Sequence, residues 1–209
     1  YFPDHAVVAS LMVQSKAEWH QIVKDVENAG ADGIELNFGC PHGMCERGMG
    51  SAVGQEPEVI KTLVGWVMEV ATVPVIVKLT PNITDITVPA MASQIGGADA
   101  ISLINTIQSL VGVDLDNFVP YPVVDGKSTN GGYCGPAVKP IALKMLTTIA
   151  QDATTSKVPV SGIGGVSTGK DAVEFMLLGA SNVQVCTAAM NHGFRIVEDM
   201  CEGLNNWMD

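Results

Sequence analysis

The stretch "AGADGIELN" (residues 29–37) runs from a glycine turn directly into an apolar segment, and two later stretches repeat this design. "GGADAISLIN" (96–105) and "LGASNVQVCT" (178–187) also place one or two polar residues between a Gly-Ala turn and an apolar run. A helix commonly ends at a glycine before the chain re-enters a sheet. The three stretches therefore predict three helix-to-strand junctions.

Further segments fit between these junctions. Apolar runs at 6–12, 73–81 and 158–165 predict strands, and the last two open with Val-Pro, as strands entered from a loop often do. Helical patterns are expected at 16–29, 56–71, 85–95, 138–151 and 169–178, with a final helix near 193–208. Strands that alternate with helices in this way predict an α/β fold with a parallel sheet and right-handed crossovers.

An open doubly wound sheet and a (β/α)8 TIM barrel both fit this alternation. Polar and glycine residues cluster after nearly every predicted strand, whereas the helix-to-strand turns are short. Chemistry at the carboxyl ends of many strands favours the barrel. Six strands are expected in residues 1–209, so we predict one partial barrel domain in which strands 3 to 8 are present and the first two are missing.

The composition limits the class of partner. The 209 residues carry a formal charge of −11, which argues against nucleic acid or an anionic membrane as the main partner. No apolar run approaches the roughly 20 residues that span a bilayer, and we expect no membrane association. The cysteines are odd in number and form no Cys-x-x-Cys pair, which favours a reducing cytoplasm and no metal site; they are Cys40, Cys45, Cys134, Cys186 and Cys201.

Glycines mark a candidate phosphate site near the end of the penultimate strand. "SGIGGVSTGKDAVEFMLLGA" (161–180) places Gly162, Gly164 and Gly165 before a Ser-Thr-Gly helix start. Backbone amides and a helix amino end both favour an anion, and barrels often bind phosphate after strands seven and eight. A tight turn that needs glycine only for its backbone conformation is the alternative.

Polar side chains at other strand ends suggest a ligand beside this phosphate. Lys78 is a lone cation in "VIVKLTP", where it stabilises a negative ligand or reaches solvent at an edge. Asn37 and Asn105 end equivalent strands, and with Thr106 they suit a cyclic amide, although Asn is also a common turn residue. Cys40 follows three residues after Asn37, where a thiol can act as nucleophile or general acid unless it is only a small buried group. We expect the other four thiols to be structural or without a role, with Cys186 inside a strand, Cys201 in the terminal helix, and Cys45 and Cys134 in loops.

The motifs "NFGCPHGMCERGMGSAVGQ", "KLTPN", "LINTI", "GGYCGPAVKPIAL", "GIGGV" and "QVCT" resemble the flavin-dependent dihydropyrimidine dehydrogenases across essentially the whole chain. "VDLDNFVPYPVVDGKSTNGGYCGPAVKPIAL" and "RIVEDM" are most similar to FMN-binding catalytic subunits of the bacterial NAD-dependent type. Class 1 dihydroorotate dehydrogenases are wider relatives that share the barrel and an Asn-x-x-Cys-Pro loop.

The resemblance implies a role for each matching position. Cys40 would exchange a proton with pyrimidine C5 as general acid, since a thiol is mostly protonated at neutral pH. A serine is common in the family at the position of Gly39. The substrate would be bordered by Asn37, Phe38, Gly39, Asn105 and Thr106, and FMN would be held by Lys78, Gly135, Gly164, Gly165, Val166, Cys186 and Thr187.

The implied reaction interconverts uracil or thymine with the 5,6-dihydropyrimidine in pyrimidine catabolism. The chain has no Gly-x-Gly-x-x-Gly fingerprint and no ferredoxin-type cysteine run, so FAD, NAD(H) and iron-sulfur clusters are expected on missing segments or on a partner subunit of a hetero- or homo-oligomer. A class 1 dihydroorotate dehydrogenase and a non-flavin phosphate-binding barrel remain the alternatives.

Overall fold

A parallel sheet forms the centre of the protein. The computed structural model describes residues 4–41 and 48–209. Its six-stranded sheet is parallel throughout, and the strands lie side by side in the order in which they occur in the chain. A doubly wound sheet reverses its strand order at a switch point, so this order matches a barrel wall instead. The strands are β1 (Val8–Leu11), β2 (Gly33–Asn37), β3 (Val75–Lys78), β4 (Ala100–Leu103), β11 (Val160–Gly162) and β12 (Asn182–Val183).

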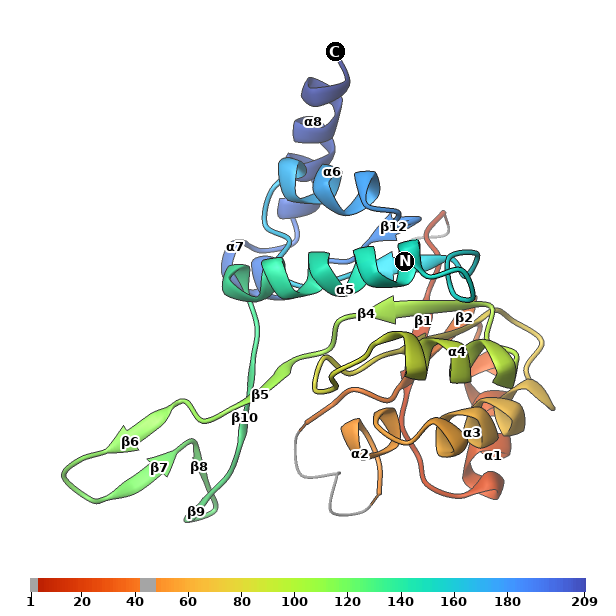
Figure 1. Ribbon diagram of the computed structural model, residues 1–209, viewed down its shortest axis with the longest axis horizontal. Helices are drawn as coiled ribbons and strands as arrows, with labels where there is room; N and C mark the ends of the chain where they lie inside the picture. The colour runs from red at the N-terminus through yellow and green to blue at the C-terminus, as the bar shows by residue number, and fades with distance from the viewer. Residues whose placement is uncertain (1–3, 42–47) are drawn as a thin grey trace.

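Helices follow the strands and cover the outer face of the sheet. In Figure 1, α3 and α4 lie next to each other on one part of the sheet, and α5 and α6 cover another part. The predicted α/β alternation is therefore confirmed. The helices are α1 (Lys16–Asn28), α2 (Ser51–Gly54), α3 (Pro57–Met68), α4 (Thr87–Gly96), η2 (Pro136–Val138), α5 (Lys139–Gln151), α6 (Gly169–Leu177), α7 (Thr187–His192) and α8 (Ile196–Met208).

The three repeated glycine turns have the backbone conformation that their sequence predicts. Gly30, Gly97 and Gly179 have φ angles of 93°, 102° and 110°, in the region that side chains with a Cβ disfavour. Each glycine ends the helix before a sheet strand. The repeats therefore set the chain direction at three helix-to-strand junctions.

The two faces of the sheet differ in polarity. Side chains such as Ile34, Leu36 and Val77 are fully buried in the hydrophobic core. The other face carries a polar residue on strand after strand, and these residues are direct cross-strand neighbours. We call this set the polar row; it runs through Asn37, Lys78, Ser102, Ser161 and Asn182.

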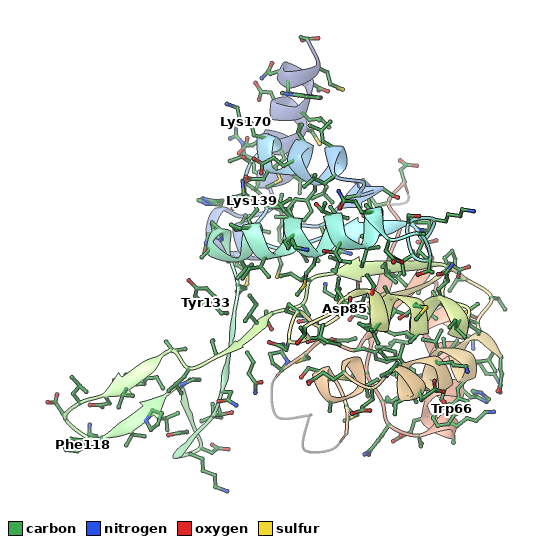
Figure 2. All side chains as sticks on the ribbon, in the orientation of Figure 1. Trp66, Asp85, Phe118, Tyr133, Lys139 and Lys170 are labelled. Carbon is green, nitrogen blue, oxygen red and sulfur yellow. The ribbon has the colours of Figure 1, made fainter. Side chains whose placement is uncertain are left out.

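A β-arm leaves the body after β4, in a region where the sequence predicts no regular element. It consists of three antiparallel pairs and projects away from the sheet, with Phe118 near its far end (Figures 1 and 2). Its strands have two or three residues, too few to show a periodic pattern. The pairs are β5 (Ile107–Ser109) with β10 (Gly131–Tyr133), β6 (Gly112–Asp114) with β7 (Val119–Tyr121), and β8 (Val123–Val124) with β9 (Lys127–Ser128).

The segment after β12 corrects two expectations. Cys186 was expected inside a strand, but β12 ends at Val183 and Cys186 is the exposed residue before α7. The expected terminal helix at 193–208 begins at Ile196, because Gly193 ends α7 with a φ of 77°. Both α7 and α8 contain apolar residues, so the sequence pattern did not show where one helix ends and the next begins. Cys45 lies outside the described residues.

Candidate active site

A pocket lies at the carboxyl ends of the sheet strands. Its walls include all seven residues that the resemblance assigns to FMN, together with Asn105 and Thr106. Its volume is about 160 Å³, below the roughly 300–1,000 Å³ of sites that enclose a drug-sized ligand. The pocket can therefore take one part of such a ligand while the rest extends beyond it.

The glycine loop after β11 forms one wall of the pocket. Gly164 and Gly165 have φ angles of 137° and 76°, and a Cβ on Gly165 would lie 2.8 Å from the carbonyl oxygen of Gly135. Within the part of the chain that the structure describes, the amides of Gly164, Gly165 and Val166 donate to no protein acceptor. These amides suit an anion such as a phosphate, because buried N–H groups require an acceptor.

Gly162 has a different role from its neighbours in the loop. A Cβ on Gly162 would lie 2.5 Å from Cδ1 of Phe175, so glycine is needed there for α6 to pack on β11. Gly162 is absent from the glycines with positive φ, so packing against Phe175 explains it better than either a phosphate contact or the tight-turn alternative. Gly164 and Gly165 line the pocket.

The amino end of α6 is not open to a phosphate, which corrects part of the sequence interpretation. Thr168 and Asp171 form a capping box, and the Asp171 carboxylate accepts hydrogen bonds from the amides of Ser167 and Thr168 at 2.9 and 2.8 Å. Lys139 at the start of α5, labelled in Figure 2, pairs with Asp171, and the Nζ-to-Oδ1 distance is 2.6 Å. The Asp171 carboxylate therefore occupies the position at this helix end that a phosphate would need.

The same contacts shift two pKa values. Burial opposes ionisation of Asp171, but hydrogen bonds from Lys139, Ser167 and Thr168 outweigh it and lower the pKa of the carboxyl. Hydrogen bonds to Asp171 and then to Glu174 raise the pKa of Lys139. The ion pair therefore stabilises the junction of α5 and α6 beside the glycine loop.

Asp171→Asn is expected to reduce the free energy of unfolding at pH 7 by about 1–2 kcal/mol, because it weakens the cap and removes the charge that pairs with Lys139. A carboxyl with a lowered pKa contributes stability above its unfolded value of roughly 3.9, and the contribution disappears as the pH falls through the lowered value. Urea unfolding of both proteins should show the difference shrinking below about pH 4. Glu174→Gln, at a more exposed partner, is the control with a smaller effect. If the difference in unfolding free energy stayed the same at low pH, the ionised Asp171 carboxylate would not be its source.

Two asparagines meet beside the pocket, as expected from their equivalent strand ends. The Asn105 Nδ2 donates to the Asn37 Oδ1 at 2.9 Å, and the same oxygen accepts the amides of Gly39 and Cys40 at 3.3 and 3.2 Å. The Asn105 Oδ1 accepts the amide of Thr106 at 2.8 Å. Both side-chain oxygens are thus used within the protein, which leaves N–H groups as the polar atoms available to a ligand.

Gly39 allows the two asparagines to approach each other. A Cβ at position 39 would lie 2.4 Å from the Cβ of Asn105, closer than two carbons can pack. The serine that is common in the resembling family could not occupy this position without moving Asn105. Glycine here is therefore coupled to the position of the asparagine.

Gly39→Ser is expected to lower the free energy of unfolding by about 1–3 kcal/mol, because Asn105 or the backbone must shift. Thermal unfolding with Gly65→Ser as control tests this, since a Cβ at Gly65 meets no atom within 4 Å. Equal losses in the two variants would show that the close contact at Gly39 is not responsible.

Cys40 and Phe38 lie on the same loop but in different surroundings. Cys40 is half-buried next to the paired asparagines, while its carbonyl accepts the amide of Ser51 at 3.0 Å. The ring of Phe38 is 2% exposed and packs edge-on against Trp19 with centroids 6.3 Å apart. A substrate contact at Phe38 would therefore involve its backbone. Neither residue lines the pocket described above.

Asn82 holds a pocket residue in place, and the sequence interpretation did not assign it a role. Its side chain donates to the carbonyl of Thr106 at 3.2 Å and accepts the amide of Gln108 at 2.8 Å. It therefore joins the loop after β3 to the start of the β-arm and fixes Thr106. Its place in "KLTPN" at a strand end was the available signal.

Polar residues inside the sheet were also missed, apart from Lys78. Glu35 accepts hydrogen bonds from Ser102 at 2.8 Å and from Gln184 at 3.3 Å, and Gln184 also donates to Ser161 at 2.8 Å. Lys78 lies 3.4 Å from Glu35 and 3.4 Å from Gln184. Polar residues within apolar runs, such as Glu35 in "GIELN" and Ser102 in "AISL", were the signal that could have revealed this cluster.

Comparison with known proteins gives the family. A sequence model described as "Dihydroorotate dehydrogenase" matches residues 1–208. The chain belongs to this family. The solved structure of a ligand-free dihydroorotate dehydrogenase from Eimeria tenella aligns with a TM-score of 0.71 at 19% identity, over 93% of this chain and 56% of that one, and shows the shared fold.

Two family members with higher identity have names that refer to dihydropyrimidines. "Dihydropyrimidine dehydrogenase (NADP(+)), chloroplastic" of Arabidopsis thaliana is 47% identical, and "NAD-dependent dihydropyrimidine dehydrogenase subunit PreA" of Escherichia coli K12 is 44% identical. Each comparison covers 99% of this chain and 50% of the relative. A "Dihydroorotate dehydrogenase B (NAD(+)), catalytic subunit" of Pyrococcus horikoshii is 37% identical over 98% of this chain and 64% of the relative. The chain spans about half the length of the two dihydropyrimidine dehydrogenases.

Two further observations concern this family member. Residues 4–41 and 48–209 contain no group of three or more His, Cys, Asp or Glu side chains that could hold a metal ion. In the same residues, no helix is both long and apolar enough to cross a membrane.

Proposed function

We propose that this chain is the FMN-binding catalytic part of a dihydropyrimidine dehydrogenase, which interconverts uracil or thymine with the 5,6-dihydropyrimidine. The observation that carries the proposal is the gathering of all seven expected FMN residues around one pocket, with the Asn37–Asn105 pair and Cys40 next to it. The names of the Arabidopsis and E. coli relatives support it.

The pocket fits the chemistry of FMN. The unpaired amides of Gly164 to Val166 are suited to the phosphate, and Lys78 at the pocket wall is suited to the electron-rich end of the flavin ring. The flavin, when bound, would supply the hydride that adds to pyrimidine C6. The positive charge of Lys78 favours the anionic reduced form of that ring.

The two asparagines recognise the pyrimidine as hydrogen-bond donors. Their oxygens are held by Gly39, Cys40, Asn105 and Thr106, so their N–H groups face a ligand. The ring carbonyl oxygens of uracil and thymine are acceptors that match them. These bonds strengthen as negative charge develops on the ring during hydride addition.

Cys40 provides the proton. Hydride adds to C6, the C5–C6 double bond becomes single, and the Cys40 thiol gives its proton to C5. The thiolate is then reprotonated from solvent. In the oxidative direction the same sulfur removes the C5 proton while hydride leaves C6.

The proposal includes a wider assembly. The six strands would be strands 3 to 8 of a (β/α)8 barrel, and residues 1–209 would belong to one domain. FAD, NAD(H) and iron-sulfur clusters would reach the FMN through further segments or a partner subunit, which the word "subunit" in the E. coli relative's name supports. A cytoplasmic location remains a prediction from the cysteine pattern.

Spectroscopy of the intact protein tests the proposal. The purified protein should be yellow, release FMN on denaturation and show loss of flavin absorbance when dihydrouracil or dihydrothymine is added without oxygen. Dihydroorotate should give a much slower change. Rapid reduction by dihydroorotate would favour the dihydroorotate dehydrogenase alternative, and a colourless protein that does not take up FMN would favour a non-flavin phosphate-binding barrel.

A further inference from the structure

Glu35 is a buried carboxylate that the proposed reaction does not use. It is 8% exposed and is the one buried charged residue among the residues that the structure describes. A buried charge is costly unless it is paired and hydrogen-bonded. Its contacts therefore show what it does for the site.

Those contacts lead to Lys78. One carboxylate oxygen of Glu35 accepts from Ser102 at 2.8 Å and from Gln184 at 3.3 Å, while the other lies 3.4 Å from the Lys78 Nζ. Lys78 and Gln184 line the pocket, whereas Glu35 does not. The carboxylate thus lies behind a wall whose ligand-facing groups are the ammonium and the amide.

Gln184 contacts three residues on the polar face of the sheet, and it does so in one orientation. Its Nε2 donates to Glu35 and to the Ser161 Oγ, and its Oε1 accepts from Lys78 at 3.4 Å. The reverse orientation would place its oxygen against the carboxylate and its NH₂ against the ammonium. The surrounding charges therefore fix the amide orientation.

The Lys78 ammonium has three donors, and Glu35 and Gln184 take two. The third N–H of the ammonium has no acceptor in residues 4–41 and 48–209. Because Lys78 lines the pocket, a ligand in the pocket could accept it. The Lys78 side chain is only 15% exposed, and a bound ring would cover it further. Burying an ammonium group costs free energy unless a partner compensates for the lost water.

We propose that Glu35 and Gln184 are positioning residues that keep Lys78 charged and aim one N–H at the pocket, so that they set how strongly the site stabilises reduced FMN. This inference deepens the proposed function and rests on it for the identity of the ligand. In the described chain, Glu35 is the acidic group within ion-pair distance of Lys78. The other side chains of this cluster are neutral: Ser102 on β4, Ser161 on β11 and Gln184 after β12.

The first test needs no flavin. In the intact protein with ¹³C-labelled lysine, the pH titration of Lys78 is followed by NMR, with the signal assigned by its loss in Lys78→Met. In the parent the residue should stay charged through neutral pH. In Glu35→Gln its acid dissociation constant should rise about tenfold or more. Ser102→Ala is the matched control, because it removes a hydrogen bond to the same carboxylate but leaves the charge, and it should titrate like the parent.

The second test uses the FMN-loaded protein without pyrimidine. The reduction potential of bound FMN should be lower in Glu35→Gln than in the parent at high pH. The difference should reverse at low pH, where Lys78 is protonated in both proteins and only the variant lacks the nearby negative charge. Lys78→Met should lower the potential at every pH, and Glu35→Asp should restore the parental pattern.

Separate outcomes identify which idea fails. Loss of the Lys78 proton near neutral pH in the parent overturns the inference even if Glu35→Gln does not fold, as does an unchanged Lys78 titration in a folded Glu35→Gln. An FMN potential that is the same in parent and Glu35→Gln at all pH values also overturns it. Failure to reduce pyrimidines, with the lysine and flavin results as expected, counts against the proposed function alone.

Discussion

Cys40→Ala is expected to lower the rate of pyrimidine reduction by about 10²–10⁴-fold while FMN remains bound. The variant lacks the proton donor for C5, whereas the pocket residues that would hold FMN are unchanged and do not include Cys40. Stopped-flow measurement of flavin reoxidation by uracil, together with the flavin spectrum, checks both parts of the prediction.

Cys201→Ala is the control for this experiment, because Cys201 is an exposed thiol on α8. It should react at the parental rate. If Cys40→Ala also reoxidised at that rate, another group would supply the proton. A Cys40→Ala protein that had lost its flavin would show instead that the thiol supports the binding site.

Gly165→Ala is expected to weaken FMN binding by about 10–100-fold, the equivalent of roughly 1–3 kcal/mol. The added Cβ would lie 2.8 Å from the carbonyl oxygen of Gly135 and 3.0 Å from the backbone nitrogen of Lys139, at a φ of 76°. The loop must then move, and its amides lose their arrangement around the phosphate. Fluorescence titration of the flavin-free protein with FMN gives the dissociation constant.

Gly126→Ala separates the close contact from backbone strain. Gly126 has a φ of 72°, but a Cβ there meets no atom within 4 Å, and the residue lies in the β-arm. Its variant should bind FMN like the parent despite a similar backbone cost. Equal binding by the parent and Gly165→Ala would remove the glycine loop from the proposed phosphate site.

Local patterns account for the parts of the fold that were predictable. Gly30, Gly97 and Gly179 end helices in every repeat, because the backbone preference of glycine acts within a few residues. The β-arm was missed for the opposite reason. Its strands are stabilised by partners up to 26 residues away, as in the pairing of Ile107 with Tyr133, and each strand is too short to show a periodic pattern.

The candidate site divides in the same way. The proximity of Asn37, Lys78 and Asn105 was predictable, because parallel strands end at a common edge. Their hydrogen-bond roles were not, since a carboxamide can donate or accept until its neighbours are known. The contact from Asn105 to Asn37 and the contact from Thr106 to Asn105 occupy both side-chain oxygens, which leaves N–H groups available.

The sequence by itself determined the α/β alternation, the glycine junctions and the loops in which polar and glycine residues gather, because these depend on residues close together in the chain. Only the tertiary structure decided that Asp171 occupies the amino end of α6, that Gly39 makes room for Asn105, and that Glu35 lies behind Lys78. The Gln184 contact to Glu35 joins residues 149 positions apart. Such contacts depend on strand order and register, which place distant side chains within hydrogen-bonding distance.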